Sequence, residues 1–337
     1  MRHTRQIRLK EVGEKGQGKI ESAAVLVIGS GGLGCPVLQY LVAAGVGKVV
    51  VVDQDVVSIS NLQRQILFTE KNLGENKAFA AKANLENLNS EIEIVAIKEN
   101  FNRENAETLL EGIDCVLDGS DNFSTKYLVN DACAMYNIPL VQGNIHQWNG
   151  QLGVYHIDGK GDLRDVFPKP PEEEPATCEE EGILGPVAGI IGSAMALEAL
   201  KILLGIAKCH FSSYDGLQLE WLALEYQPVN REAIDYKKED YDFYCATKEK
   251  WALAKNVLES RGGNYIQIDV REEYELENKK SGIIYIPLGD LKENPLSEKV
   301  GDKVPLFICG NAKRSKAAAQ WYRDKFNTDA YYLKESL

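Results

Sequence analysis

The chain has 337 residues, about twice the usual length of a single domain, so two domains are expected. Lysine and arginine number 38 against 50 acidic residues, and the net charge of −12 disfavours nonspecific binding to nucleic acid or to an anionic membrane. The seven cysteines never form a Cys-x-x-Cys pair, which argues against a disulfide framework and favours a reducing, cytoplasmic compartment. No signal peptide and no apolar stretch long enough to cross a bilayer is expected.

The first two-thirds of the chain alternates between strand and helix patterns. Short β-branched runs at residues 23–28 and 46–52 flank a segment with helical spacing at 33–44, which predicts a β–α–β unit. Four further strands are expected at 92–97, 115–118, 139–142 and 153–156, and two further helices at 77–88 and 126–136. This alternation predicts an α/β domain with a mostly parallel, Rossmann-like sheet covered by helices on both faces.

Residues 160–182 interrupt this alternation. Four prolines and two runs of three glutamates predict a mobile loop that contributes nothing to the core. Residues 186–204 then predict a buried helix, and residues 211–226 predict antiparallel strands that close the domain. The expected domain therefore covers 1–227, and the polar segment 228–244 is interpreted as a linker.

A second, smaller α/β domain is expected over residues 245–337. Its predicted elements are a helix at 248–261, strands at 265–270, 283–287 and 304–309, and a helix at 316–326.

A glycine-rich loop follows the first predicted strand and precedes the first helix of the β–α–β unit. It contains four glycines, Gly29, Gly31, Gly32 and Gly34. In this context glycines let backbone N–H groups and a helix N-terminus face a phosphate. Asp53 ends the next strand, where its carboxylate can bind a ribose hydroxyl. Alone, this pattern suits an NAD-dependent oxidoreductase as well as an ATP-using enzyme.

The residues that follow favour adenylyl transfer. Hydride transfer needs mainly a cofactor cleft and one acid or base, whereas adenylyl transfer needs cations on a triphosphate and an acid that holds magnesium. Arg64 and Lys77 can supply the cations, and Asp121 can supply the acid. The sequence therefore predicts ATP and Mg²⁺ as cofactors.

Six motifs, in this order along the chain, resemble those of the ubiquitin-activating-enzyme-like family. They are Arg5-Gln6, the glycine loop, the motif from Asn61 to Gln65, Lys77, Asp121-Asn122 and Gly185-Pro186. The resemblance covers residues 2–226 and is strongest to the MoeB/ThiF-type adenylyltransferases. It implies a homodimer that adenylates the C-terminal Gly-Gly carboxylate of a ubiquitin-like sulfur carrier of the MoaD/ThiS type.

The same resemblance implies a role for each motif residue. Asp53 would bind the ribose, three residues the phosphates, Asp121 the magnesium, and Arg5 the nucleotide site of the partner subunit. The three phosphate-binding residues are Asn61, Arg64 and Lys77, and Asp55, Gln65 and the four glycines complete the nucleotide-binding set. Arg64 and Asp121 are also counted as catalytic.

Cys178 occupies a place where a cysteine of this family attacks the acyl-adenylate or joins an acyl-persulfide link. The following helix N-terminus favours a thiolate, whereas the glutamates at 172–174 and 179–181 oppose it. A surface cysteine without a role is the alternative.

Most bacterial relatives hold a structural zinc with two Cys-x-x-Cys pairs. This chain has Asp162 and Asp165 at the first pair and no cysteine at the second, so no zinc site is expected.

Cys309 follows a predicted strand and precedes a helix, next to Lys313 and Arg314. Backbone N–H groups, the helix dipole and two cations would stabilise a thiolate or a persulfide there. Cys-x4-Arg-Ser together with Asp269-Val270-Arg271-Glu272 resembles the rhodanese-like sulfurtransferases over 248–337.

The resemblance implies that Cys309 takes sulfur from a persulfide donor and makes a carrier thiocarboxylate, for molybdopterin or thiamine biosynthesis. Three alternatives stay open: an inactive rhodanese module, an NAD-dependent oxidoreductase, and a noncatalytic docking module.

Overall fold

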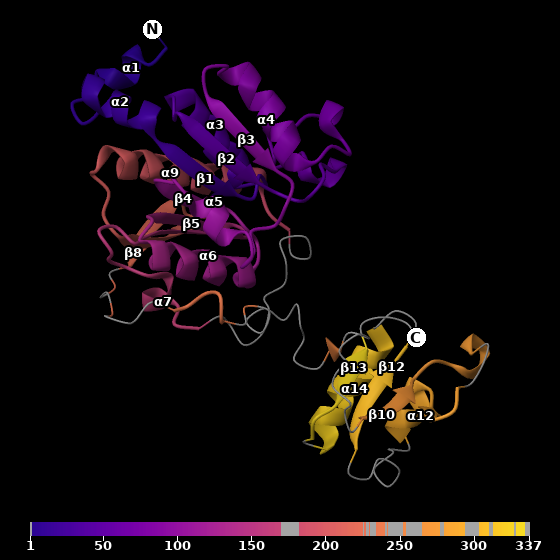
Figure 1. The fold of residues 1–337 in the computed structure, drawn as a ribbon. Coiled ribbons are helices and arrows are strands. Elements are labelled where there is room, and N and C mark those ends of the chain that lie inside the picture. Colours follow the sequence, from indigo (N-terminus) through magenta and orange to yellow (C-terminus); the bar gives the residue numbers. More distant parts are fainter. Residues whose placement is uncertain are drawn as a thin grey trace. The chain divides into compact units, whose positions relative to one another are not determined.

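The computed structural model describes residues 2–169, 182–224, 226, 229, 234–239, 241, 252–253, 265–276, 280–293, 303–309, 313–326 and 328–333. The chain divides into two compact units, Met1–Tyr244 and Cys245–Leu337. Each unit contains its own sheet with flanking helices (Figure 1).

The first unit is built on an eight-stranded sheet in the order β3-β2-β1-β4-β5-β6-β7-β8. Its strands are β1 (Ala24–Ile28), β2 (Lys48–Val52), β3 (Glu93–Ile97), β4 (Cys115–Asp118), β5 (Leu140–His146), β6 (Asn149–Tyr155), β7 (His210–Asp215) and β8 (Glu220–Leu224). The first five pair in parallel, and β6, β7 and β8 continue the sheet in antiparallel pairs. The predicted α/β class with a mostly parallel sheet is confirmed.

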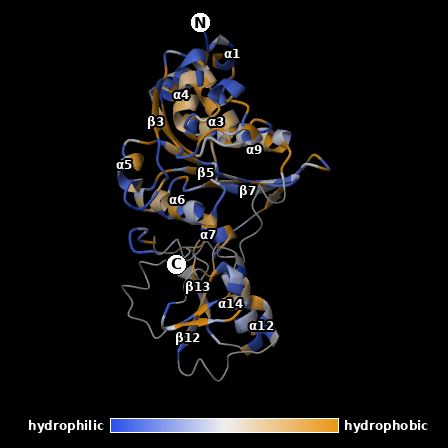
Figure 2. Ribbon diagram, turned by 90° about the vertical axis from the view of Figure 1, so that its right-hand side faces the viewer, coloured by the Kyte–Doolittle hydropathy of each residue, from blue (hydrophilic) through white to orange (hydrophobic). Residues whose placement is uncertain are grey.

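Helices cover both faces of this sheet because its strands are apolar on both sides. In β1, Val25 and Val27 pack into the core with α3 (Gly34–Ala44), α4 (Lys77–Leu88) and α9 (Gly185–Leu204), whereas Leu26 and Ile28 pack with α5 (Ala106–Leu110) and α6 (Phe123–Tyr136). Figure 2 shows orange, hydrophobic stretches in the strand β3 and the helix α3 of this unit. The remaining helical segments are α1 (Thr4–Ile7), α2 (Gly13–Ser22), η1 (Ile59–Asn61), η2 (Glu70–Asn72) and α7 (Leu163–Val166).

The second unit contains a five-stranded parallel sheet in the order β11-β10-β12-β13-β9. Its elements are β9 (Ala252–Leu253), β10 (Tyr265–Asp269), η4 (Glu273–Glu275), β11 (Ile283–Tyr285), α12 (Leu288–Glu293), β12 (Val304–Ile308), α14 (Lys313–Phe326) and β13 (Tyr331–Leu333). One prediction is wrong here, because the helix expected over 248–261 contains strand β9, which pairs with β13.

The segment interpreted as a linker packs onto the first unit wherever it is described. Tyr236 and Tyr241 are buried in its core, and the Tyr241 hydroxyl donates to Asp131 Oδ2 over 2.6 Å. These aromatic side chains anchor an otherwise polar stretch to the first unit. The interpretation of 228–244 as a free linker is therefore wrong for these residues.

The loop expected over 160–182 also contributes to the core at its beginning. Leu163 and Arg164 on α7 are buried, and the Arg164 guanidinium pairs with the carboxylate of Asp131 at 2.7 Å. The prediction that this stretch adds nothing to the core is therefore wrong for α7. The later prolines and glutamates lie outside the described residues.

Helix α9 is long and apolar enough to cross a membrane by length and composition, contrary to the expectation that no stretch would be. Its buried residues include Val187, Ile191 and Met195, and two of them, Ile191 and Met195, pack in the core with the strands β1 and β2. A core helix can have the same composition as a membrane span, and the buried face of α9 packs against the sheet.

Candidate active site

The predicted nucleotide-binding segments meet at the carboxyl ends of neighbouring parallel strands. β1 pairs with β2 on one side and with β4 on the other, so the strand order reverses at β1. The glycine loop follows β1, Asp53 follows β2, and residues 119–122 follow β4. In open α/β sheets, ligands bind in the crevice at such a reversal of strand order.

The glycine loop turns too tightly for side chains at two positions. Gly29 has φ of +82°, and a Cβ built on Gly34 would lie 2.0 Å from the Gly29 carbonyl oxygen. Asp53 fixes the loop, because its Oδ2 accepts from the Ser30 backbone N–H and from the Ser30 hydroxyl, each over 2.8 Å. The other oxygen, Oδ1, accepts only from the Asp55 backbone N–H over 2.9 Å among the described contacts, so its second lone pair can accept a ribose hydroxyl.

Arg64 and Gln65 lie against this loop. A Cβ on Gly32 would come within 3.5 Å of Arg64 Cγ, and one on Gly31 within 3.7 Å of Gln65 Nε2. Arg64 donates to the Ser60 carbonyl over 3.1 Å, and it pairs with no carboxylate in the part of the chain that the structure describes. Its charge is therefore available to an anion in front of the loop.

Asn61 was expected to bind a phosphate, but its side chain bonds to the protein backbone instead. It is buried, and its Oδ1 accepts from the Ser58 backbone N–H over 3.1 Å, so that it caps η1. The side chain thereby shapes the turn that presents Arg64.

Lys77 begins α4 and is 7% exposed, and its Nζ lies 2.9 Å from Asp55 Oδ2. The amide of Asn76 donates to the backbone carbonyls of Asp53 and Asp55. These contacts tie the start of α4 to the end of β2, which brings Lys77 to the same edge as the glycine loop.

The β4–α6 turn contributes an exposed acid and a buried hydroxyl. Asp121 is exposed, and Asn122 caps α6 by accepting from the Thr125 backbone N–H over 2.8 Å. The Ser120 hydroxyl is buried with no hydrogen-bond partner in the described part of the chain, and the sequence alone does not single this residue out. Lys126 is buried, and its Nζ donates to the Gly143 carbonyl over 2.7 Å.

An adenine nucleotide fits these residues. The glycine loop packs closely against protein atoms, and two polar atoms beside it, Gln65 Oε1 and Ser120 Oγ, are buried without a partner among the described residues. Buried polar atoms without partners are rare, so these two are candidate contacts for a ligand in front of the loop.

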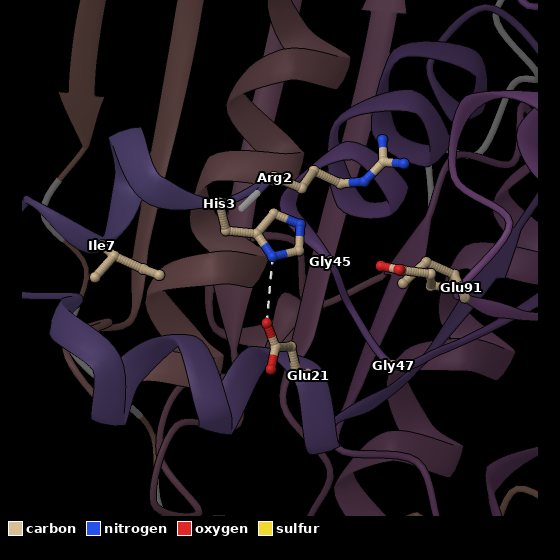
Figure 3. Close-up of a pocket in the computed structure, with 8 residues that line it drawn as sticks. Arg2, His3, Ile7, Glu21, Gly45, Gly47 and Glu91 are labelled. Atoms are coloured by element: carbon tan, nitrogen blue, oxygen red, sulfur yellow. Dashed lines mark hydrogen bonds and ion pairs between the residues drawn. The ribbon is translucent and has the colours of Figure 1, made fainter.

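Arg5 lies apart from this edge of its own sheet. α1 is held at the amino ends of the strands, because Gln6 donates to the Ala44 carbonyl over 2.8 Å, just before β2 begins. Figure 3 shows His3 of the same segment bonded to Glu21, beside a cavity of about 680 Å³. Arg5 is exposed.

The cysteines differ in how they can react. Burial raises the pKa of the Cys35 thiol to about 12 and also raises those of Cys115 and Cys133, so these three stay protonated at neutral pH. Cys178 lies outside the described residues.

The two aspartates that stand at the first Cys-x-x-Cys position bind protein groups. Asp162 Oδ1 accepts from Asn130 Nδ2 and from the Arg164 backbone N–H, and Asp165 Oδ1 accepts from the Val229 backbone N–H. Among the described residues, no three histidine, cysteine or acidic side chains are placed to hold a metal ion together.

Cys309 directly follows β12 in the second unit and is 1% exposed. Its Sγ lies 3.2 Å from the Ser315 hydroxyl and accepts from the Ser315 backbone N–H over 3.3 Å. The first turn of α14 therefore faces the sulfur, as the sequence predicts. Arg314, however, is paired with Glu275.

Comparison with known proteins identifies the first unit. The model of the "ThiF family" matches residues 3–233. The chain belongs to the ThiF family.

Two relatives extend this result. The "Adenylyltransferase and sulfurtransferase MOCS3" of Xenopus laevis is 46% identical, and the match covers 100% of this chain and 84% of that protein. The "Sulfur carrier protein adenylyltransferase" of Thermus thermophilus is 43% identical over 70% of this chain and 94% of its own length. The present protein is accordingly an enzyme, an adenylyltransferase that also carries a sulfurtransferase unit. The comparisons give no support to an NAD-dependent oxidoreductase or a docking module.

A solved structure shows the same fold. MccB of E. coli crystallised with ATP matches with a TM-score of 0.56 and 21% identity, over 67% of this chain and 73% of that one. At this identity the likeness concerns the fold alone.

Proposed function

We propose that the first unit binds ATP with Mg²⁺ and adenylates the C-terminal Gly-Gly carboxylate of a ubiquitin-like sulfur carrier. The observation that carries this proposal is the meeting of the glycine loop, Arg64, Lys77 and Asp121 at one edge of the sheet in a ThiF-family chain. The carboxylate attacks the α-phosphorus of ATP, and pyrophosphate leaves as the acyl-adenylate forms.

The residues divide this work by their charge. Arg64 and Lys77 bind the phosphate oxygens and stabilise the charge on the departing pyrophosphate. Asp121 is the exposed carboxylate that would hold magnesium, which supplies further charge neutralisation when bound. Asp53 binds the ribose and keeps Ser30 and the glycine loop in place.

The second unit supplies sulfur. Cys309, carrying a persulfide, attacks the acyl carbon of the adenylate, AMP leaves, and an acyl disulfide remains. A second thiol, for which Cys178 is the candidate, breaks the S–S bond and releases the thiocarboxylate. The resulting protein disulfide is reduced by an external thiol.

Assembly, location and metal content complete the proposal. The enzyme works as a homodimer in which Arg5 reaches the nucleotide of the partner subunit, and it acts in the cytoplasm on a persulfide donor. The thiocarboxylate serves molybdopterin or thiamine biosynthesis. The fold needs no zinc, because hydrogen bonds to Asp162 and Asp165 connect the segments there.

Replacement of single cysteines tests the division between the units. Cys309→Ala should abolish thiocarboxylate formation from a persulfide donor and leave pyrophosphate release unchanged, because adenylation uses only the first unit. Cys178→Ala should keep adenylation and slow the transfer step. Cys209→Ala is the matched control, since Cys209 is partly buried with its Sγ bonded to the Lys160 carbonyl. Wild-type transfer in Cys309→Ala would show that the second unit is an inactive module.

A further inference from the structure

Glu275 holds the arginine of the Cys309 loop in a two-bond ion pair. Arg314 Nη2 donates to Glu275 Oε1 over 2.6 Å, and Arg314 Nη1 donates to the other carboxylate oxygen. The carboxylate is itself fixed, because its Oε2 accepts from the Glu272 backbone N–H over 2.9 Å in the capping box of η4. A guanidinium held by both oxygens of one carboxylate has a defined position.

This pair borders the reactive sulfur directly. Arg314 precedes Ser315, whose hydroxyl and backbone N–H both contact Cys309 Sγ. The two α14 groups described in contact with the sulfur, both from Ser315, are neutral, and the positive charge of Arg314 is matched by Glu275.

A second arginine near the loop is paired in the same way. Arg271 follows β10, and its guanidinium binds both oxygens of Asp269, the shorter contact measuring 2.6 Å. Asp269 is 1% exposed, which fixes the pair at the end of the strand next to β12. Both guanidinium groups described around this strand edge are thus neutralised by carboxylates.

The charge of the leaving group decides which sulfur donor such a site can use. With thiosulfate, the Cys309 thiolate attacks the outer sulfur, the S–S bond breaks, and the dianion sulfite leaves with the electron pair. With a thiol persulfide, RSSH, the thiolate attacks the terminal sulfur, and the thiolate RS⁻ leaves with one negative charge. A departing dianion needs unpaired cations nearby to stabilise its charge, whereas a departing thiolate needs far less stabilisation of this kind.

We infer that Glu275 is a specificity-determining residue, which withholds Arg314 from small dianionic sulfur donors and so reserves Cys309 for persulfides. This inference rests on the proposed role of Cys309 in sulfur transfer. Glu275 acts through Arg314 and touches no reacting atom.

Donor kinetics of the full-length Glu275→Gln variant test this role. Glu275→Gln should lower KM for thiosulfate at least fivefold, because Arg314 regains an unpaired charge, and should leave kcat/KM for glutathione persulfide within twofold of wild type. Asp290→Asn is the matched control, since it removes an exposed carboxylate from the same unit, and neither donor should change. An unchanged KM for thiosulfate, or an equal loss with both donors, would overturn the inference.

Two further measurements keep the outcomes distinct. The double variant Glu275→Gln, Arg314→Gln should keep the wild-type KM for thiosulfate, because it removes the pair without freeing a charge; a change of more than twofold contradicts the inference even if Glu275→Gln alone fails to fold. Cys309→Ala in the same assay separates the two proposals. Turnover that survives this change refutes the role of Cys309, whereas turnover that needs Cys309 but ignores Glu275 refutes only the inference.

Discussion

Replacing Lys77 by glutamine removes the most deeply buried cation at the proposed triphosphate site. Lys77 is 7% exposed and contacts Asp55, whose own side chain is 60% exposed. A hydrogen bond from a charged donor is worth about 1.5 to 3 kcal/mol, so the dissociation constant of ATP should rise about 10- to 150-fold. If Lys77 served only its pair with the exposed Asp55, the change would cost about 1 kcal/mol of stability or less and would leave ATP binding intact.

Calorimetric titration with ATP distinguishes these outcomes. Lys82→Gln is the matched control, because Lys82 lies on the same helix, is 41% exposed and pairs with Glu86 at 3.7 Å. Its ATP affinity should equal that of wild type. A loss below threefold in Lys77→Gln, or an equal loss in Lys82→Gln, would refute the assignment of Lys77 to the phosphates.

Three further changes test the site and its supports. Asp121→Ala should remove adenylation without lowering the melting temperature, since Asp121 is exposed, and undiminished pyrophosphate exchange would exclude it as the magnesium ligand. Asp131→Asn should cost about 3 to 5 kcal/mol in urea unfolding, because it leaves the buried Arg164 charge unpaired, and a loss below about 1 kcal/mol contradicts this view. Arg314 lowers the pKa of Glu275 from 4.5 to about 2, so its contribution to stability is complete above about pH 4.5 and is lost as the pH falls toward 2. Hydrogen exchange of second-unit peptides should show this acid dependence in wild type and not in Glu275→Gln.

Local patterns in the sequence predict the elements that build the site. The start of α4 at Lys77 and the strand from Cys115 to Asp118 are confirmed to the residue, because helical spacing and short buried runs are properties of neighbouring residues. The glycine loop can be recognised for the same reason. The atom that excludes a Cβ at Gly34 is the carbonyl oxygen of Gly29, which is close in the sequence. Such features need no knowledge of distant partners.

Contacts between distant residues could not be predicted in this way. Asp131 meets Arg164 across 33 residues and Tyr241 across 110, and neither spacing follows from helix or strand periodicity. These partners explain why α7 and residue 241 belong to the first unit. Glu275 and Arg314 are 39 residues apart. The sequence therefore does not show that the positive charge of Arg314, near Cys309, is paired in the fold.

Carrier-dependent ATP–pyrophosphate exchange shows whether this enzyme activates a carrier carboxylate with ATP. Purified enzyme should incorporate labelled pyrophosphate into ATP only when a sulfur carrier with a free C-terminal Gly-Gly is added. A carrier that lacks the last glycine should give none. Exchange that is independent of the carrier terminus, or no exchange with any carrier of the MoaD or ThiS type, would show that the enzyme does not activate a carrier carboxylate.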